Sequence, residues 1–410
     1  MNAQGSETLS RFLAPEGAPD LCRALAWRRS LERWAQLQAQ AQAVPHDQVL
    51  AYVVDQLPRL STSGRHAVLG SPDAAIFVQA HVTGRQDVAA DLAVLGSLHA
   101  ESQTDRPVNL TMQGSLVCRR QGVGRALIVN EGSQLDGLSI TFAGETISLA
   151  ARVAGGGSWV RELRRDGAPV NGVERRACVG EDAWELVDGW PGFANPFDDG
   201  NESPLLDDVS RVDLTNALKQ AWNLVTSISP GATKEMRETA RYLRPLRPRA
   251  ADTIPSFSSR ELPGVLFVGT HRRDGVQIEF AHLAESCFHE HLHNRLYLLE
   301  SAFPLTLPET PPRRYWSPWK MKERGIDGMV HAIYVFAHLA WFWRRAANLS
   351  DAAFASVALR RSGDHSAALR NALHTIATTT ELAPAGEAVV ASARDTLDEA
   401  AGEWRGPYAS

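Results

Sequence analysis

The chain has 410 residues, a length that predicts two or three domains with buried cores. Its composition, 44% hydrophobic and 22% charged, is typical of a soluble globular protein, and a formal net charge of only -5 argues against binding to nucleic acid or to an anionic membrane. The four cysteines are far apart and form no CxxC pair, which favours reduced thiols in a cytoplasmic protein. We expect no signal peptide, and the most hydrophobic run, Met329 to Trp343, is too short to cross a bilayer.

The first hundred residues favour helices. Asp20 is a suitable cap for a helix whose apolar stripe includes Leu21, Leu25 and Leu31, and a second helix is expected after Asp47. No catalytic motif is found here. We therefore expect a helical N-terminal region over residues 1–105.

The pattern then changes to short alternating runs, such as Val108 to Met112 and Leu138 to Phe142, separated by Gly, Asn and Asp. Such alternation predicts an antiparallel sheet, and Asn171-Gly172 is a good two-residue hairpin turn. We assign residues 106–197 to this antiparallel β region.

Residues 198–410 are predicted to form a mainly helical, metal-binding catalytic domain. Its helices are expected from about Asp213, and Val265 to Val268 reads as a short buried strand. Asp327 is expected to cap a long apolar helix. The whole chain is thus predicted to be α+β and mainly α.

The stretch from Gln277 to Ser301 contains the motif HExxH, with His289, Glu290 and His293. It has no Gly or Pro, which favours a helix, and in a helix two residues four apart project from one face. Two imidazoles in this arrangement can hold one divalent metal ion. Because three of the 13 histidines lie between residues 289 and 293, the cluster indicates a metal site.

A third ligand must come from elsewhere. The metzincin extension is absent, because Leu296 and Leu299 occupy its Gly and His positions. Glu300 lies nearly two turns from His293 on the same helix, so His331 or His338 is geometrically better. A site with three His ligands and open positions suits both zinc hydrolysis and non-haem iron(II) chemistry.

Three sequence blocks resemble a known family. Phe288 to Leu296, Tyr315 to Lys320 and Asp327 to His338, the last followed by Phe-Trp-Arg, are similar in order and spacing to the HExxH-motif peptide-modification proteins. The resemblance covers about residues 256–345. It implies an iron- and 2-oxoglutarate-dependent oxygenase that hydroxylates a side-chain β-carbon of a ribosomally made precursor peptide.

The same resemblance implies roles for individual residues. His289, His293 and His331 correspond to the iron ligands. Lys320 stands where the family usually has Arg, and it and Arg324 are the candidate cations for the distal carboxylate of 2-oxoglutarate. The family's Gly after the third His is an alanine here. The Lys replacement gives up bidentate contact with a carboxylate.

Three functions follow from these observations. In the oxygenase, Glu290 hydrogen-bonds a ligand histidine or lines the substrate pocket, and the regions before residue 198 recognise a leader peptide or shape the substrate channel. His338 is expected to support a ligand histidine by a hydrogen bond, to contact the substrate or to be a hydrogen-bonded core histidine. In a zinc metallopeptidase, Glu290 acts as general base. A third hypothesis is a peptide-binding module with a structural metal site and no catalysis.

Overall fold

The computed structural model describes most of the chain. The residues described are 3–84, 91, 94–95, 97–98, 101, 108–112, 116–118, 133–143, 146–153, 157–164, 184–187, 206, 208–249, 254–307, 313–349 and 352–402. The expected hairpin turn at Asn171-Gly172 and the expected boundary between residues 197 and 198 lie outside them.

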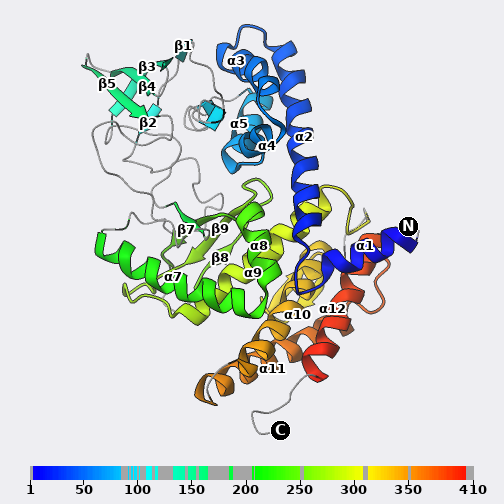
Figure 1. Ribbon diagram of the computed structural model, residues 1–410. Helices are drawn as coiled ribbons and strands as arrows, with labels where there is room; N and C mark the ends of the chain where they lie inside the picture. The colour runs from blue at the N-terminus through cyan, green and yellow to red at the C-terminus, as the bar shows by residue number, and fades with distance from the viewer. Residues whose placement is uncertain are drawn as a thin grey trace. The chain divides into compact units, whose positions relative to one another are not determined.

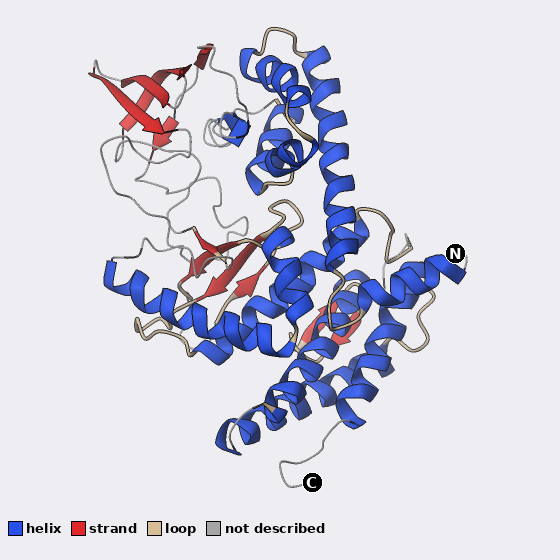
Figure 2. Ribbon diagram, in the orientation of Figure 1, coloured by secondary structure: helices blue, strands red, loops and turns tan. Residues whose placement is uncertain are grey.

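The chain forms two compact units, each assembled from separate stretches of sequence. Unit 1 comprises Met1–Leu25, Asn216–Ala240 and Ile278–Ser410, and unit 2 comprises Ala26–Thr215 and Arg241–Gln277. This division differs from the three consecutive regions expected from the sequence, because contacts within a unit join segments more than 200 residues apart, such as Arg23 with Glu238. Helices predominate and strands are short, so the prediction of a mainly α, α+β fold is confirmed (Figures 1 and 2).

Unit 1 is built around α10. This helix packs against α9, α11 and α12, and α9 also contacts α8 (Figure 1). Trp341, Phe342 and Trp343 are consecutive and all fully buried, so α10 is buried on every side, as expected for a helix apolar all round. The helices of this unit are α1 (Ala3–Leu13), α8 (Pro230–Thr239), α9 (Phe280–Glu300), α10 (Ile326–Asn348), α11 (Ala352–Thr375) and α12 (Pro384–Gly402).

Unit 2 contains two sheets. One is antiparallel, with β3 paired to β1, β2 and β4, and β4 paired to β5; the other has the order β6-β7-β9-β8, with β6-β7 and β7-β9 parallel. The expected strand at Val265 is β9, and its residues are all buried. The strands are β1 (Val108–Met112), β2 (Leu116–Cys118), β3 (Ser133–Ala143), β4 (Thr146–Val153), β5 (Gly157–Arg164), β6 (Glu185–Leu186), β7 (Tyr242–Leu246), β8 (Ser256–Phe257) and β9 (Val265–Gly269).

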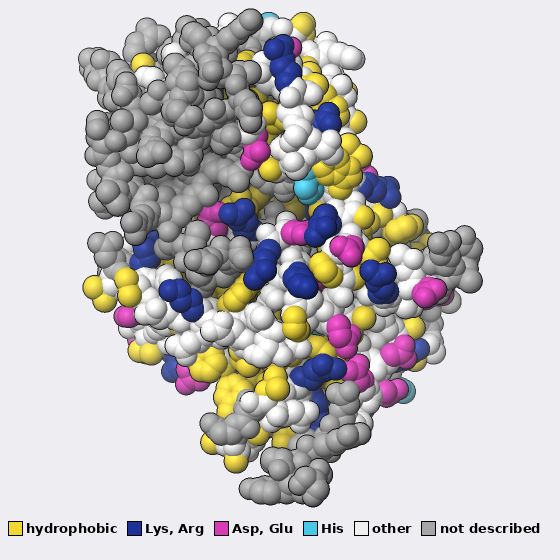
Figure 3. Space-filling view, in the orientation of Figure 1, with side chains coloured by type: hydrophobic (Ala, Val, Ile, Leu, Met, Phe, Trp, Pro, Cys, Tyr) yellow, Lys and Arg dark blue, Asp and Glu magenta, His cyan; other side chains and the backbone are white. Residues whose placement is uncertain are grey.

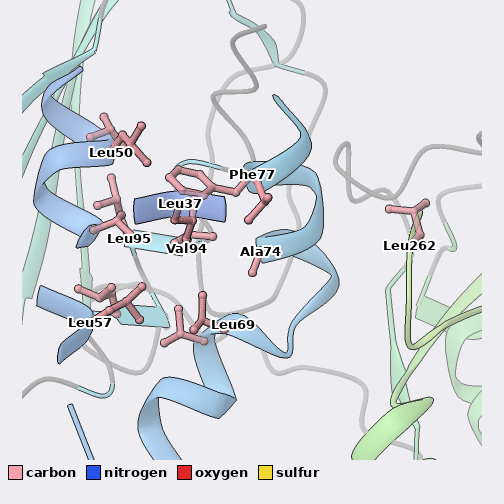
Figure 4. Packing of buried hydrophobic residues seen from close by; sticks show 14 of the residues in the cluster. Leu37, Leu50, Leu57, Leu69, Ala74, Phe77, Val94, Leu95 and Leu262 are labelled. Carbon is pink, nitrogen blue, oxygen red and sulfur yellow. The ribbon is translucent and has the colours of Figure 1, made fainter. Parts of the chain in front are cut away.

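The helices in and leading into unit 2 follow the cap signals in the sequence. Asp47, Ser61 and Ser71 each accept a hydrogen bond from a backbone N–H of the helix that they precede. Leu37, Leu57 and Phe77 are among the buried side chains that pack between these helices (Figure 4). The helices are α2 (Pro19–Ala43), α3 (Gln48–Gln56), the 3-10 turn η1 (Leu57–Arg59), α4 (Thr62–Leu69), α5 (Pro72–Val82) and α7 (Asp208–Ile228), and α2 and α7 each continue into unit 1.

Three further features are the distribution of surface charge, the state of two cysteines and the hydrophobicity of the helices. Basic and acidic side chains are interspersed on the face shown in Figure 3. Cys22 and Cys287 are free and buried. Among the residues that the structure describes, no helix is both long and apolar enough to cross a membrane.

A buried histidine in unit 2 gives the protein a pH-dependent stability. His81 lies 3.0 Å from Asp47 and 3.1 Å from Asp91. Burial by itself would lower the pKa of His81, but the two carboxylates raise it from 6.5 to about 9. Because the folded pKa lies above the unfolded one, this stabilisation is complete below pH 6.5 and is lost as the pH rises through about 9.

We therefore expect the free energy of unfolding of unit 2 to fall by up to about 3 kcal/mol between about pH 6 and about pH 9.5. Urea unfolding at the two pH values measures the change. The His81→Gln variant is the control, because it lacks the titrating group and should lose most of the pH dependence. An equally steep fall in this variant would assign the effect to another group.

Candidate metal site

Helix α9 positions the HExxH pair. A turn precedes it: Gly275 has a positive φ of +87°, and its backbone N–H donates to the carbonyl of Arg272. Without Gly or Pro, the helix then runs unbroken to Glu300, and the Nε2 atoms of His289 and His293 lie 3.2 Å apart. Two nitrogens bound to one ion at about 2.0–2.1 Å lie roughly 3.0–3.4 Å apart. The pair therefore has the spacing of two ligands of one metal ion.

Both imidazoles are neutral at physiological pH, as metal binding requires. Burial lowers the pKa of His289 to about 4, although its side chain is still 22% exposed. The pKa of His293 is also well below its usual value, because of burial and the neighbouring imidazoles. The pair thus offers neutral nitrogen ligands to a metal ion.

His331, from α10, lies beside this pair. Its Nδ1 is 3.1 Å from Nδ1 of His293, and the two rings are nearly parallel, at 18°. His293 faces His289 with Nε2 and His331 with Nδ1, and His331 lies outside the group whose donor atoms are all within 4.8 Å of one another. Binding of one ion by all three histidines therefore requires the His293 ring to turn, because one imidazole binds an ion through a single nitrogen. The tertiary structure thus brings the three histidines singled out in the sequence side by side.

Glu290 is close to the same nitrogens. Its side chain is 1% exposed, and Oε1 lies 3.8 Å from Nε2 of His289. Within the described part of the chain, the group whose donor atoms all lie within 4.8 Å of one another comprises His289, Glu290 and His293. The carboxylate can thus act on a molecule bound at the metal position or bind the ion itself.

Glu300 contacts His331. Its Oε1 lies 3.2 Å from Nε2 of His331, and both side chains are largely buried. This is the nitrogen of His331 that points away from His293. Glu300 therefore contacts His331 and is not a member of the group formed by His289, Glu290 and His293.

The aromatic block after residue 313 forms a hairpin, which was not among the elements expected from the sequence. β10 (Tyr315–Ser317) pairs with β11 (Lys322–Arg324), and the hairpin is drawn in red among the helices of unit 1 in Figure 2. Tyr315 and Ser317 are buried and Trp316 between them is exposed, which is the period of a strand. Because the exposed residue is a tryptophan and one of the buried residues is a serine, the hydrophobicity of the sequence carried no corresponding signal.

The hairpin carries the two candidate cations. Lys320 is exposed and Arg324 is half-buried, and both positive charges help to lower the pKa of His293. They therefore act on the imidazoles electrostatically, as expected for groups that attract an anion to the site. Arg324 also lies over the first turn of α10, where a Cβ on Gly328 would be 3.0 Å from the guanidinium.

In the oxygenase that the resemblance implies, we expect Gly328→Ala to displace the Arg324 guanidinium and to weaken 2-oxoglutarate binding by about 10- to 100-fold, since a charge-assisted hydrogen bond contributes about 1.5–3 kcal/mol. The fold should be unaffected or slightly more stable, because Ala is the better helix former. Calorimetric titration with 2-oxoglutarate measures the loss. Gly363→Ala on α11 is the matched control, as a Cβ there meets no atom within 4 Å. Equal losses in both variants would contradict a specific role for Arg324.

His338 is not at the site, contrary to the expectation that it supports the ligands. Its Nδ1 faces the carbonyl of Tyr334 at 2.8 Å, and its Nε2 faces that of Leu13 at 2.9 Å. Burial lowers its pKa to about 3, so the ring is neutral and donates to one of these carbonyls. Seven residues make nearly two full turns, so the two histidines share a face but lie about 10 Å apart along α10, where His331 meets α9 and His338 meets Leu13 at the end of α1.

The structure adds residues that the sequence reading did not assign. Phe336 lies edge-on to His289, with ring centroids 5.4 Å apart, and stacks on Trp319 at 4.4 Å. Its other neighbour is His365, which contacts Glu285 at 3.0 Å. Glu285 precedes His289 by four residues, and this helical spacing was the available signal. Together these side chains form one wall beside the histidine pair.

Comparison with known proteins adds no relative: no family model matches the chain, and no curated protein matches its sequence. The case for a function rests on the site and on the sequence blocks described above.

Proposed function

We propose that the protein is an iron(II)- and 2-oxoglutarate-dependent oxygenase that hydroxylates a side-chain β-carbon of a ribosomally synthesised precursor peptide. The observation that carries this proposal is the approach of His331 to the HExxH pair, with its Nδ1 3.1 Å from His293. A cluster of imidazole ligands suits non-haem iron(II). The similarity of the three sequence blocks to the peptide-modification family supports the same assignment.

The donor set fits this cofactor and cosubstrate. His289, His293 and His331 would hold Fe(II), which with bound 2-oxoglutarate supplies the oxidising power to hydroxylate an unactivated C–H bond. Lys320 and Arg324 provide positive charge near the imidazoles, as a dianionic cosubstrate needs. The chain's own tasks are to orient the three rings, to attract the cosubstrate and to present the peptide. A cytoplasmic location and peptide recognition by the region before residue 198 belong to the same proposal.

A zinc metallopeptidase is the second candidate, and the position of Glu290 favours it. Its carboxylate is buried and lies 3.8 Å from Nε2 of His289. In this alternative the carboxylate takes a proton from the attacking water at the metal. The oxygenase requires no base at this position.

The products distinguish the two functions. Hydroxylation consumes O2 and 2-oxoglutarate and yields succinate, CO2 and a peptide heavier by one oxygen atom. The protein is loaded anaerobically with Fe(II), then given 2-oxoglutarate, O2 and a precursor peptide encoded nearby, and succinate and peptide mass are measured. Peptide fragments with stoichiometric zinc and no succinate would replace this proposal with the peptidase.

The Glu290→Gln variant provides a second test. It removes a general base but keeps the shape of the side chain, so it should abolish peptidase activity and leave measurable oxygenase activity. His374→Ala, a substitution at an exposed position of α11, is the control and should keep the metal content and activity of the wild type.

A further inference from the structure

Glu300 occupies a position that is unfavourable for a carboxylate. It is the last residue of α9, where the partial negative charge of the helix terminus repels an anion. Its side chain is only 12% exposed, so water does not fully solvate the charge. A compensating partner is therefore required, and the contact at 3.2 Å with Nε2 of His331 supplies a donor.

This contact selects the tautomer of His331. A carboxylate accepts hydrogen bonds, so the proton of a neutral His331 lies on Nε2, the nitrogen that faces Glu300. The lone pair is then on Nδ1, the nitrogen that lies 3.1 Å from His293. In metal sites, a carboxylate on the far nitrogen of a ligand histidine fixes the ring and makes it a better ligand.

We propose that Glu300 is a positioning residue for the metal centre: it holds His331 through Nε2–H and thereby assigns Nδ1 as the ligand atom of this histidine. The inference rests on the metal site of the proposed function but not on its oxidation chemistry. It also explains why Glu300, a candidate ligand from its place in the sequence, lies outside the group formed by His289, Glu290 and His293.

The contacts around His331 support a fixed ring. Tyr297, one turn before Glu300 on α9, packs against His331 with ring centroids 5.2 Å apart. His293 lies against the same ring at 5.4 Å. With Glu300 on the third side, rotation of the imidazole is restricted before any metal binds, which lowers the entropy cost of binding.

Zinc affinity of the whole protein tests the proposal without any catalytic assay. Glu300→Leu removes the acceptor and should weaken zinc binding about 10- to 100-fold in competition with a chelator. Glu300→Gln keeps an oxygen that accepts from Nε2–H and should retain most of the affinity. Glu279→Leu, an exposed carboxylate just before α9, is the matched control.

The tautomer of His331 is a readout that a merely structural role would not change. Long-range proton–nitrogen NMR correlations of the zinc-loaded protein should show His331 protonated at Nε2 in the wild type and in Glu300→Gln. Equal zinc affinity of the wild type and Glu300→Leu overturns the proposal, and so does a Gln variant as weak as the Leu variant, which indicates a direct ligand. If the Glu300 substitutions change zinc affinity as expected but the wild type yields no succinate, the oxygenase proposal is overturned and the role of Glu300 stands. A wild type that binds no metal overturns both proposals.

Discussion

Replacing His293 with alanine is expected to weaken metal binding by about 100- to 1000-fold and to abolish activity. The binding free energy of about 10–16 kcal/mol for a four-ligand zinc site corresponds to about 2.5–4 kcal/mol per ligand. His293 is the most sensitive of the three histidines, because its ring contacts both of the others, at 3.2 Å and 3.1 Å. Without it, the nitrogens of His289 and His331 have no common neighbour.

Zinc and iron(II) binding by competition titration measures this loss. The apo protein should unfold at nearly the same urea concentration as the wild type, since the substitution removes a polar ring from a largely buried position. His374→Ala on α11 is the matched control, because its side chain is exposed and should leave affinity unchanged. Wild-type affinity in His293→Ala would place the metal elsewhere.

The second large effect concerns the buried charges on the other face of α9. His291 does not join the metal site; its Nε2 lies 2.9 Å from Glu235 of α8, and Arg295 lies 3.2 Å from the same carboxylate. Glu235 also accepts from the backbone N–H of Ala18. Burial would raise the pKa of Glu235, but the Arg295 guanidinium and the hydrogen bond from His291 lower it to about 2.

Glu235→Ala is expected to destabilise unit 1 by about 3–5 kcal/mol, because it leaves the Arg295 charge buried without its partner. Urea unfolding of the full chain measures the change. Glu238→Ala on the same helix is the matched control: its ion pair with Arg23 is exposed and should contribute less than about 1 kcal/mol. Similar losses in the two variants would contradict the importance of the buried network.

The same network sets the behaviour in acid. Because the folded pKa of Glu235 lies below its unfolded value of 4.5, its contribution is complete above that pH. It is lost as the pH falls from about 4.5 through about 2. In the Glu235→Ala variant this part of the acid destabilisation should be absent.

The local signals in the sequence determined the elements that carry the site. The absence of Gly and Pro between Gln277 and Ser301 predicted the helix, and the spacing of four residues predicted that His289 and His293 share a face. The apolar run after Asp327 likewise predicted α10, although the helix begins at Ile326, with Gly325 at the cap position and Asp327 in its first turn. These features depend on neighbours within one or two turns.

The roles of the remaining residues depended on contacts between distant segments. His331 and His338 share a helix and a residue type, yet one lies beside His293 and the other against Leu13. Glu300 and Glu235 are both helical glutamates with a histidine partner. The packing of α9 against α10 brings Glu300 to His331, and the packing of α9 against α8 brings Glu235 to His291. The sequence by itself therefore determined which side chains each helix presents. The tertiary structure decided which of these side chains meet. The reason is that a charged or polar group is tolerated in the interior only where another segment supplies a partner.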